Sequence, residues 1–456
     1  MRRRFWESRS ELRRQAMRDA TGYSAPGAAA DETNLYCIGD HGRPSVSGTH
    51  MQTIEEGSIT SAPGFEAAGV TCGLKAAGAL DLALIYSPHD CVGAAVFTTN
   101  AIKAAPLVYD HRVLLQNPTG LRGVVINSGC ANACTGERGL QDAEATALAA
   151  ATALGVEAHD LMVMSTGVIG MPMPMDKILR GIALAVARRS SSTDAGHAAA
   201  RAIMTTDTRP KEAALLVSTD DGQFTIAGMA KGAGMIHPNM ATMLCLVTSD
   251  AKITPDLAQR ALDEAIIDSF NMITVDGDTS TNDTVLLMAS GLAHMQPIEV
   301  PESAGYEGFS QGLGHVLTEL AKAVVRDGEG ATRFIEITVR GTKTRAEARQ
   351  VARTVARSVL VKTAIYGGDA NWGRIICAVG YSGVAIDPGR IRLWLGDLEL
   401  VRDGEPYDVS EERATHILAQ PEIPVTIDLG LGHARATAWT CDLSHKYVDI
   451  NAHYRT

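Results

Sequence analysis

Apolar residues in the first half of the chain fall into short runs that alternate with small or polar residues, and Gly, Pro or Asn bounds each run. Such alternation between turn residues is typical of half-buried β-strands. From about residue 64 onward the pattern predicts strands over 80–87, 93–99, 122–129, 162–170, 224–230 and 244–249. The last two are expected to pair with each other.

A second pattern, in which apolar and Ala positions recur every three or four residues, predicts helices. The clearest helix covers 139–154 and ends before Gly155, a residue type that commonly follows helix ends. Further helices are expected over 175–188, 193–204, 255–270 and 313–325, and further strands over 284–289, 334–340, 391–396 and 424–429. Because strands and helices do not alternate strictly, the pattern favours a layered α+β fold over a doubly wound sheet.

Composition narrows the class of protein. Of the 456 residues, 45% are hydrophobic and 20% are charged, which excludes a disordered chain. No apolar run approaches the ~18 residues that a membrane-spanning helix needs. A net charge of −11 argues against a general affinity for nucleic acid or anionic membranes. We therefore expect a soluble cytoplasmic protein that binds neither nucleic acid nor membrane.

Cysteine spacing favours neither a disulfide framework nor a metal site. The eight cysteines include no CxxC pair, and the closest two, Cys130 and Cys134, have no further ligands at a suitable spacing. An HExxH motif is also missing from the sequence. The expectation is therefore reduced thiols and no bound metal.

Residues 1–50 differ from the rest of the chain in charge. Eight arginines and six acidic residues give this segment a charge of +2, which leaves −13 for residues 51–456. The segment has no apolar stretch of the secretory type, and the acids Glu7, Glu11 and Asp19 argue against a mitochondrial presequence. The mitochondrial matrix is nevertheless the alternative to the cytoplasm. We expect a disordered extension or a start codon placed too early.

The most informative stretch reads AKGAGMIHPNMATMLCLVTSDA. Gly232 and Gly234 beside Lys231 predict a turn that brings backbone amides and one ammonium group close to a small ligand. Pro238–Asn239 is a further turn signal, and Thr242 then stands at the start of a very apolar strand. A hydroxyl group in this setting suits a nucleophile, but β propensity alone also explains a Thr there. The pattern leaves both interpretations open.

Residues 231–244, KGAGMIHPNMATML, resemble the signature of the glutamate N-acetyltransferase family, also called ornithine acetyltransferases. The resemblance extends from about residue 58 to the last residue. Seven further blocks follow the family pattern: NSGCANACTG at 127–136, STGVIG at 165–170, IMTTDTRPK at 203–211, VDGDTSTNDT at 275–284, DGEGATR at 327–333, LVKTAIYGGDANWGRI at 360–375 and CDLSHKYVDINAHYRT at 441–456. Residues 1–50 have no counterpart in it.

The resemblance implies a layered α/β/β/α sandwich similar to that of N-terminal-nucleophile enzymes, and a precursor that cleaves itself between Ala241 and Thr242. The products would be an alpha chain, 51–241 after the unmatched start 1–50, and a beta chain, 242–456. The new α-amine of Thr242 has an ordinary pKa of about 7.7–8.0, so it can act as the base for the hydroxyl group of the same residue. Two alpha and two beta chains would form a heterotetramer.

The implied reaction moves the acetyl group of N2-acetylornithine to glutamate through an acetyl-Thr242 intermediate, as a step of arginine biosynthesis. No cofactor is implied, although acetyl-CoA is a conceivable second acetyl donor. Matching the motifs assigns Thr166 and Gly167 to the oxyanion hole. It assigns substrate contacts to Thr205 (or its neighbour Thr206), Lys231, Thr242, Glu329, Asn451 and Thr456. Cys130 stands where the family more often has Asn.

Two other functions remain open from the sequence. One is a related N-terminal-nucleophile aminopeptidase or amidohydrolase, in which water and not an amine takes the acyl group. The other is an uncleaved protein that binds amino acids. Glu329 and Asn451 favour transfer to an amine over hydrolysis, and the intact PNMAT motif favours cleavage over simple binding.

Overall fold

The computed structural model describes residues 48–237, 243–408 and 410–453, which belong to one compact unit that starts at Gly48. The predicted cleavage point Ala241–Thr242 and the predicted contact Thr456 lie outside the described residues. So does the predicted N-terminal extension up to residue 47.

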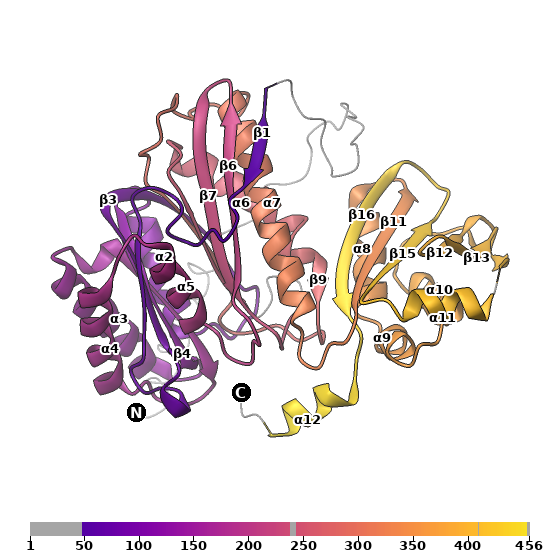
Figure 1. The fold of residues 1–456 in the computed structure, drawn as a ribbon, viewed down its shortest axis with the longest axis horizontal. Helices are drawn as coiled ribbons and strands as arrows, with labels where there is room; N and C mark the ends of the chain where they lie inside the picture. The colour runs from indigo at the N-terminus through magenta and orange to yellow at the C-terminus, as the bar shows by residue number, and fades with distance from the viewer. Residues whose placement is uncertain (1–47, 238–242, 409, 454–456) are drawn as a thin grey trace, which may run out of the picture. The chain divides into compact units, whose positions relative to one another are not determined.

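The larger of the two sheets in the described residues has nine strands (Figure 1). In spatial order they are β1 (His50–Thr53), β6 (Lys211–Thr219), β7 (Gly222–Lys231), β8 (Leu244–Ser249), β10 (Thr284–Ala289), β3 (Leu82–Phe97), β4 (Leu121–Cys130) and β5 (Leu161–Val168), and β2 (Glu66–Val70) pairs with β3 beside this path. The central strands β8 and β10 are parallel to each other and antiparallel to their outer neighbours β7 and β3. The expected pairing of 224–230 with 244–249 is confirmed.

Strand β3 joins two halves of this sheet. Its first part pairs with β2 and β4, its last part pairs with β10, and its register with β4 is broken between Tyr86 and Cys91. The prediction of two separate strands, 80–87 and 93–99, is wrong. The exposed residues 88–90 leave the ladder with β4 but keep an extended backbone, so one long strand runs through both halves.

The two halves face each other across an apolar core to which each contributes every second residue: Leu244, Leu246 and Leu286 from one half, and Ala83, Ile85 and Ile126 from the other. Cys245 and Val247 point the opposite way and pack with α6 (Pro255–Ile267) and α7 (Ala304–Arg326). On the far side, Leu84 and Val125 pack with α3 (Gly136–Leu154) and α4 (Met175–Arg188). This order of helix, sheet, sheet and helix confirms the predicted layered α+β fold (Figure 1).

Helices α2 (Ala105–Gln116) and α5 (Thr193–Ala202) also contribute residues to the core between the two halves. Short 3₁₀ helices connect other elements: η1 (Ala76–Gly78), η2 (Ala158–Asp160), η3 (Phe270–Met272) and η4 (Pro388–Arg390).

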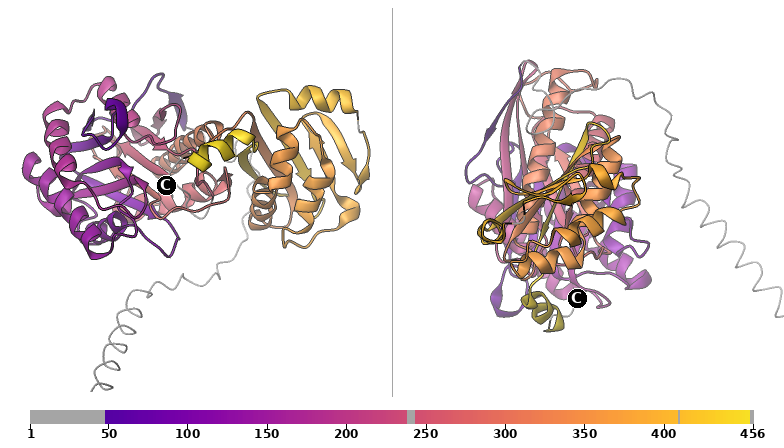
Figure 2. Two further views of the ribbon diagram at one scale, coloured as in Figure 1. Left: turned by 90° about the horizontal axis from the view of Figure 1, so that it is seen from below. Right: turned by 90° about the vertical axis from the view of Figure 1, so that its right-hand side faces the viewer.

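The smaller sheet in the described part of the chain has seven strands. Their order is β14 (Glu405–Pro406), β13 (Leu398–Arg402), β12 (Arg392–Leu395), β15 (Glu422–Asp428), β11 (Phe334–Thr342), β16 (Ala434–Cys441) and β9 (Ile273–Thr274). Its accompanying helices are α8 (Arg345–Ala356), α9 (Val359–Tyr366), α10 (Trp372–Gly380) and α11 (Glu411–Leu418). The chain leaves this sheet through α12 (His445–His453), which Figure 2 shows from below.

Helix α7 has 23 residues and starts at Ala304, nine residues before the predicted start at 313. The sequence there contains several glycines, which normally weaken a helix. Two of these glycines face strand β6: a methyl group on Gly308 would lie 2.4 Å from a Thr219 methyl, and one on Gly312 would lie 2.8 Å from Val217. Close packing against the sheet therefore explains the longer helix. Among the described residues, no helix is both long and apolar enough to cross a bilayer.

The close approach of β2 to α5 leads to a prediction about stability. A Cβ atom on Gly69 would lie 2.1 Å from the Ala198 carbonyl oxygen, whereas one on Gly314, inside α7, meets nothing within 4 Å. We expect Gly69→Ala to lower the urea midpoint of unfolding because β2 and α5 must separate. Gly314→Ala should leave it unchanged or raise it, since Ala favours helix over Gly by about 1 kcal/mol. Equal midpoints for both variants would contradict this close approach.

Candidate active site

All six predicted site residues that the structure describes line one cavity of about 200 Å³. They come from segments far apart in the sequence: Thr166, Gly167, Thr205, Lys231, Glu329 and Asn451. Thr206, the alternative to Thr205, lines the same cavity. The predicted nucleophile Thr242 lies outside the described residues. Its neighbour in sequence, Met243, leads directly into β8, where Leu244 pairs with Lys231.

The Thr166–Gly167 pair closes the end of β5, and Gly167 needs to be a glycine. Its φ of +130° lies in a region that favours glycine, and an added Cβ would lie 2.3 Å from the Gly129 carbonyl carbon. Strand β4 therefore passes directly against this end of β5. Of the two residues, Thr166 also receives a hydrogen bond: the Lys231 ammonium lies 3.3 Å from its hydroxyl oxygen.

Lys231, at the end of β7, is the buried cation of the cavity. Its side chain is 3% exposed, and burial lowers its pKa, while the nearby Asp207 carboxylate opposes that effect. A cation held in a water-poor pocket attracts a carboxylate more strongly than it would in water. The cavity is thus suited to a ligand with an anionic group.

Glu329 stands in the DGEG loop after α7, packed against the turn that follows Lys231. Its backbone N–H donates to the Ala233 carbonyl oxygen at 2.8 Å, and a Cβ on Gly234 would lie 2.4 Å from the Glu329 carboxyl group. Any larger residue at 234 would displace this carboxylate. The Asn451 side chain of α12 donates to Glu329 Oε2 at 2.7 Å, so the C-terminal helix reaches the cavity.

Helix α12 is held at the cavity by two further contacts. The Ser444 hydroxyl donates to the Gly330 carbonyl oxygen at 2.6 Å, and the Tyr447 hydroxyl donates to Asp276 Oδ2 at 3.3 Å. Burial and the adjacent Asp276 raise the pKa of Tyr447, so its hydroxyl stays protonated as a donor. The described part of the C-terminal segment therefore forms one wall of the site.

The sequence did not single out five polar residues of the cavity: Asp276, Asp278, Ser280, Asn282 and Tyr447. Asp276 holds the turn after Lys231, since its carboxylate accepts the Met235 N–H at 2.5 Å and the Ile236 N–H at 2.9 Å. Asp278 is exposed at the rim of the cavity. All five lie inside the blocks 275–284 and 441–456, which were recognised only as whole motifs.

Asn282 fixes the loop after β4, which lies next to Thr166 and Gly167 at the end of β5. Its amide group donates to the Ala131 carbonyl oxygen at 2.7 Å and to the Ser165 carbonyl oxygen at 2.8 Å. Cys130 lies at the start of this loop, buried, with its thiol 3.5 Å from the Met171 carbonyl oxygen, and burial raises its pKa. The unusual cysteine therefore occupies a small buried slot as a protonated thiol.

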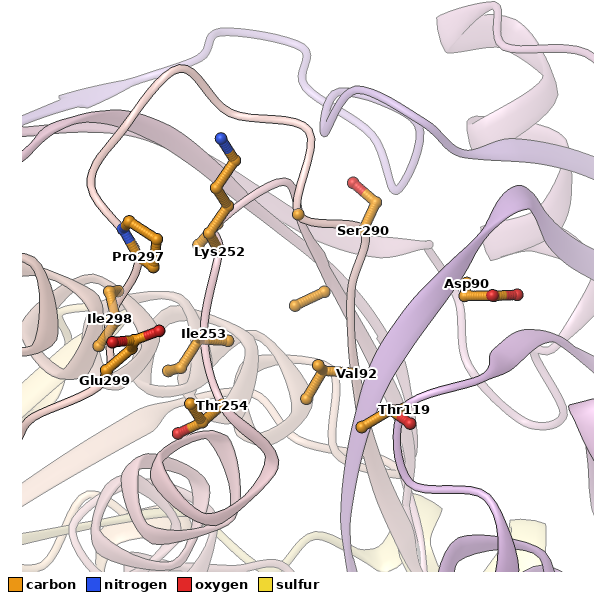
Figure 3. A pocket seen from close by; sticks show the side chains of 13 residues that line it. Asp90, Val92, Thr119, Lys252, Ile253, Thr254, Ser290, Pro297, Ile298 and Glu299 are labelled. Carbon is orange, nitrogen blue, oxygen red and sulfur yellow. The ribbon is translucent and has the colours of Figure 1, made fainter.

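A larger hollow of about 260 Å³ lies near the opposite ends of β8 and β10 (Figure 3). Asp90, Lys252 and Glu299 are its charged residues, and Asp90 and Glu299 are exposed. None of the predicted site residues lines it. Within the described residues, no group of three or more His, Cys, Asp or Glu side chains is arranged to hold a metal ion. The smaller cavity, with its buried cation, is the candidate active site.

Comparison of the sequence with known protein families and curated proteins identifies one family. A profile described as the ArgJ family matches residues 66–456. The arginine biosynthesis bifunctional protein ArgJ of Symbiobacterium thermophilum is 51% identical over 403 residues, which cover 88% of this chain and 99% of that protein. The mitochondrial protein of the same description from Schizosaccharomyces japonicus is 46% identical over 88% of this chain and 94% of its own length.

Two solved structures are also similar in sequence. The ArgJ protein of Bacillus halodurans is 46% identical, with a TM-score of 0.44, and the match covers 45% of this chain and 97% of that one. The ornithine acetyltransferase of Mycobacterium tuberculosis, solved in complex with ornithine, is 43% identical, with a TM-score of 0.38, over 41% of this chain and 98% of that one.

His237, in the segment after Lys231, leads to a prediction about how stability depends on pH. Burial, together with Arg353 and Arg357, lowers the pKa of His237 to about 4, whereas unfolding returns it to about 6.5. Below pH 6.5 the unfolded chain takes up a proton that the folded chain refuses, so stability falls between pH 6.5 and 4. Between pH 7.5 and 5.0 the full pKa difference would lower the free energy of unfolding by about 2 kcal/mol. Because the ring is only half-buried and solvent screens its charge, we expect a loss of about 1 kcal/mol.

His237→Gln should remove that loss. Urea unfolding at pH 7.5 and 5.0 measures it: the variant should lose about 1 kcal/mol less stability than the parent on acidification. An equal loss in both proteins would mean that His237 is not held in its neutral form.

Proposed function

Because the chain belongs to the ArgJ family, we propose that it is a glutamate N-acetyltransferase that moves the acetyl group of N2-acetylornithine to glutamate. The observation that carries this proposal is the single cavity lined by Thr166, Gly167, Lys231, Glu329 and Asn451. These residues come from four separate segments, and each was expected from the family motif to serve the same reaction.

The reaction proceeds in two acyl transfers on Thr242. The chain first cleaves itself between Ala241 and Thr242, which gives fragments of 241 and 215 residues. The freed α-amine then takes the proton from the Thr242 hydroxyl as Oγ attacks the acetyl carbonyl carbon of N2-acetylornithine. The C–N bond breaks, ornithine leaves with that proton on its amine, and the acetyl group remains as an ester.

Glutamate completes the cycle. Its neutral α-amine attacks the acetyl ester, the C–O bond to Thr242 breaks, and the amine's proton returns to the hydroxyl group through the α-amine of Thr242. Both steps develop an oxyanion, which Thr166 and Gly167 stabilise. Removal of one oxyanion donor typically costs about 10²–10³ in kcat.

The charges of the cavity suit two amino acids in turn. Both carry an α-carboxylate, which pairs with the buried ammonium of Lys231. Both also present an α-nitrogen, which lies beside Glu329 as an amine before or after transfer. Because Lys231 and Glu329 are each less than a tenth exposed, these ion pairs form in a water-poor setting and orient the ligand strongly.

Several further features belong to the same proposal. Acetyl-CoA is a second acetyl donor to be tested, which would make the enzyme bifunctional. The two fragments assemble as a heterotetramer of two alpha and two beta chains, and the enzyme works in the cytoplasm, with the mitochondrial matrix as the alternative. Thr456 and Thr205 complete the substrate contacts.

The alternatives are an aminopeptidase or amidohydrolase of related fold and an uncleaved amino-acid-binding protein. Family membership favours neither. Product analysis separates them: the transferase converts N2-acetylornithine and glutamate into ornithine and N-acetylglutamate, whereas a hydrolase releases acetate at the same rate with or without glutamate.

Thr242→Ala should abolish both cleavage and transfer. On a denaturing gel the parent should give two bands, the shorter beginning TMLCLVTS, and the variant one band of full length. Acetyl transfer by the variant should fall below detection because the nucleophile and the new amine are both lost. Thr242→Ser, which keeps a hydroxyl group and an amine, should retain cleavage and part of the activity. Normal transfer by an uncut parent would contradict the mechanism.

Asp278→Asn tests how the site treats the two side chains. Ornithine ends in an ammonium group and glutamate in a carboxylate, and Asp278 contributes an exposed negative charge at the rim. We expect the variant to raise KM for N2-acetylornithine by up to about fivefold and to leave KM for glutamate equal or lower, because an exposed ion pair is worth up to about 1 kcal/mol. Asp397→Asn, an exposed carboxylate on the smaller sheet, should change neither.

A further inference from the structure

Lys211 is a buried cation that the motif analysis left without a role. It begins strand β6 and is 2% exposed. Its ammonium group donates to Asp207 Oδ1 at 2.6 Å and to Asp327 Oδ2 at 2.6 Å. Lysine is almost never fully buried unless it is paired, and here two carboxylates surround it. Neither Lys211 nor its two partners lines the cavity, so the cluster lies behind the site.

Asp207 connects this cluster to two cavity segments. Its Oδ2 accepts the Thr205 N–H at 2.8 Å, and its Oδ1 accepts the N–H of Gly232, the residue after Lys231, at 2.7 Å. Burial alone would raise the pKa of Asp207, but Lys231 and Lys211 outweigh it and hold the pKa at about 2. The carboxylate is therefore ionised throughout the physiological range.

Asp327 connects the same ammonium group to a third cavity segment. It stands two residues before Glu329, and its Oδ2 also accepts the Thr208 N–H at 3.0 Å. Its other oxygen accepts the Thr208 hydroxyl. One ammonium group thus links the loop with Thr205, the turn with Lys231 and the loop with Glu329.

We propose that Lys211, Asp207 and Asp327 form the positioning centre of the active site, which fixes Thr205, Lys231 and Glu329 relative to one another. The proposal rests on the proposed acetyl transfer. The three residues do not touch the substrate: they act through the segments whose backbone they hold. The buried charges fix the positions of these segments and add little net stability, because the desolvation cost of a buried ion pair offsets its attraction.

Asp207 has a second effect, on the charge of Lys231. Five charged groups act on that ammonium: Asp207, Asp283 and Glu329 favour the charged form, whereas Lys211 and Lys75 disfavour it. Asp207 is the largest of the three favourable influences. Replacing it by Asn keeps an oxygen acceptor for Gly232 but removes the charge, so the pKa of Lys231 falls. Lys231 then loses its proton at a lower pH.

Three variants separate positioning from mere folding. Asp207→Asn removes the carboxylate beside Lys231, and Asp327→Asn removes the one beside Glu329. The control is Asp250→Asn: Asp250 is also buried, and it accepts the Thr225 N–H at the other end of β7.

Kinetics with N2-acetylornithine and glutamate give the readout, after a gel and an unfolding curve establish that each variant is folded and cut. We expect Asp207→Asn to lower kcat/KM at least tenfold and to move the alkaline limb of its pH profile down by about one unit. Asp327→Asn should raise KM at least fivefold without moving that limb. The Asp250→Asn control should stay within twofold of the parent in both measures.

Each other outcome has a definite meaning. An active parent with Asp207 and Asp327 variants that match the Asp250 control, or that change only the unfolding midpoint, overturns the positioning centre and leaves the proposed function standing. A folded parent that transfers no acetyl group overturns the proposed function, and this inference with it.

Discussion

Carboxylates that accept backbone N–H groups hold the active-site segments in place. In the connection between β7 and β8, the described residues 232–237 and 243 lie outside the ladders of the sheet, and their buried amides require an acceptor. Asp207 accepts the N–H of Gly232, Asp276 accepts those of Met235 and Ile236, and Asp283 accepts that of Met243 at 3.0 Å. Both described ends of this connection are thereby fixed to separate elements. The position of Lys231 and the start of β8 depend on these bonds.

Asp207, whose pKa is lowered, brings a negative charge into the interior, and two buried lysines lie beside it. Lys211 and Lys231 lie near Asp207, and both are at most 3% exposed. A lone buried charge would be costly, whereas alternating cations and anions with several hydrogen bonds each keep that cost small. The same arrangement gives the cavity a cationic residue, Lys231, and an anionic one, Glu329. The placement of the site segments and the charges of the cavity thus have one electrostatic origin.

The sequence predicted much of the fold, and its failures have physical causes. The strands at 244–249 and 284–289 were predicted with the observed bounds, because their apolar residues are continuous and turn residues flank them. The first turns of α7 were missed since their glycines serve contact with β6. The six cavity residues were found through family motifs. Asp278 and Tyr447 were not found, because a sequence motif does not show which of its polar residues faces a cavity. The burial of Lys211 was also not predicted, because lysine is usually exposed.

The strand order of the larger sheet has a consequence for how the enzyme is made. If the chain is cut before residue 242, strands β8 and β10 belong to the later piece, yet on both sides they pair with strands of the earlier piece, β7 and β3. Neither piece can complete the middle of that sheet alone. Folding must therefore come before cutting, and two polypeptides synthesised independently would each lack a template for assembly. The uncut chain would thus bring the strands of both pieces together before the cut is made.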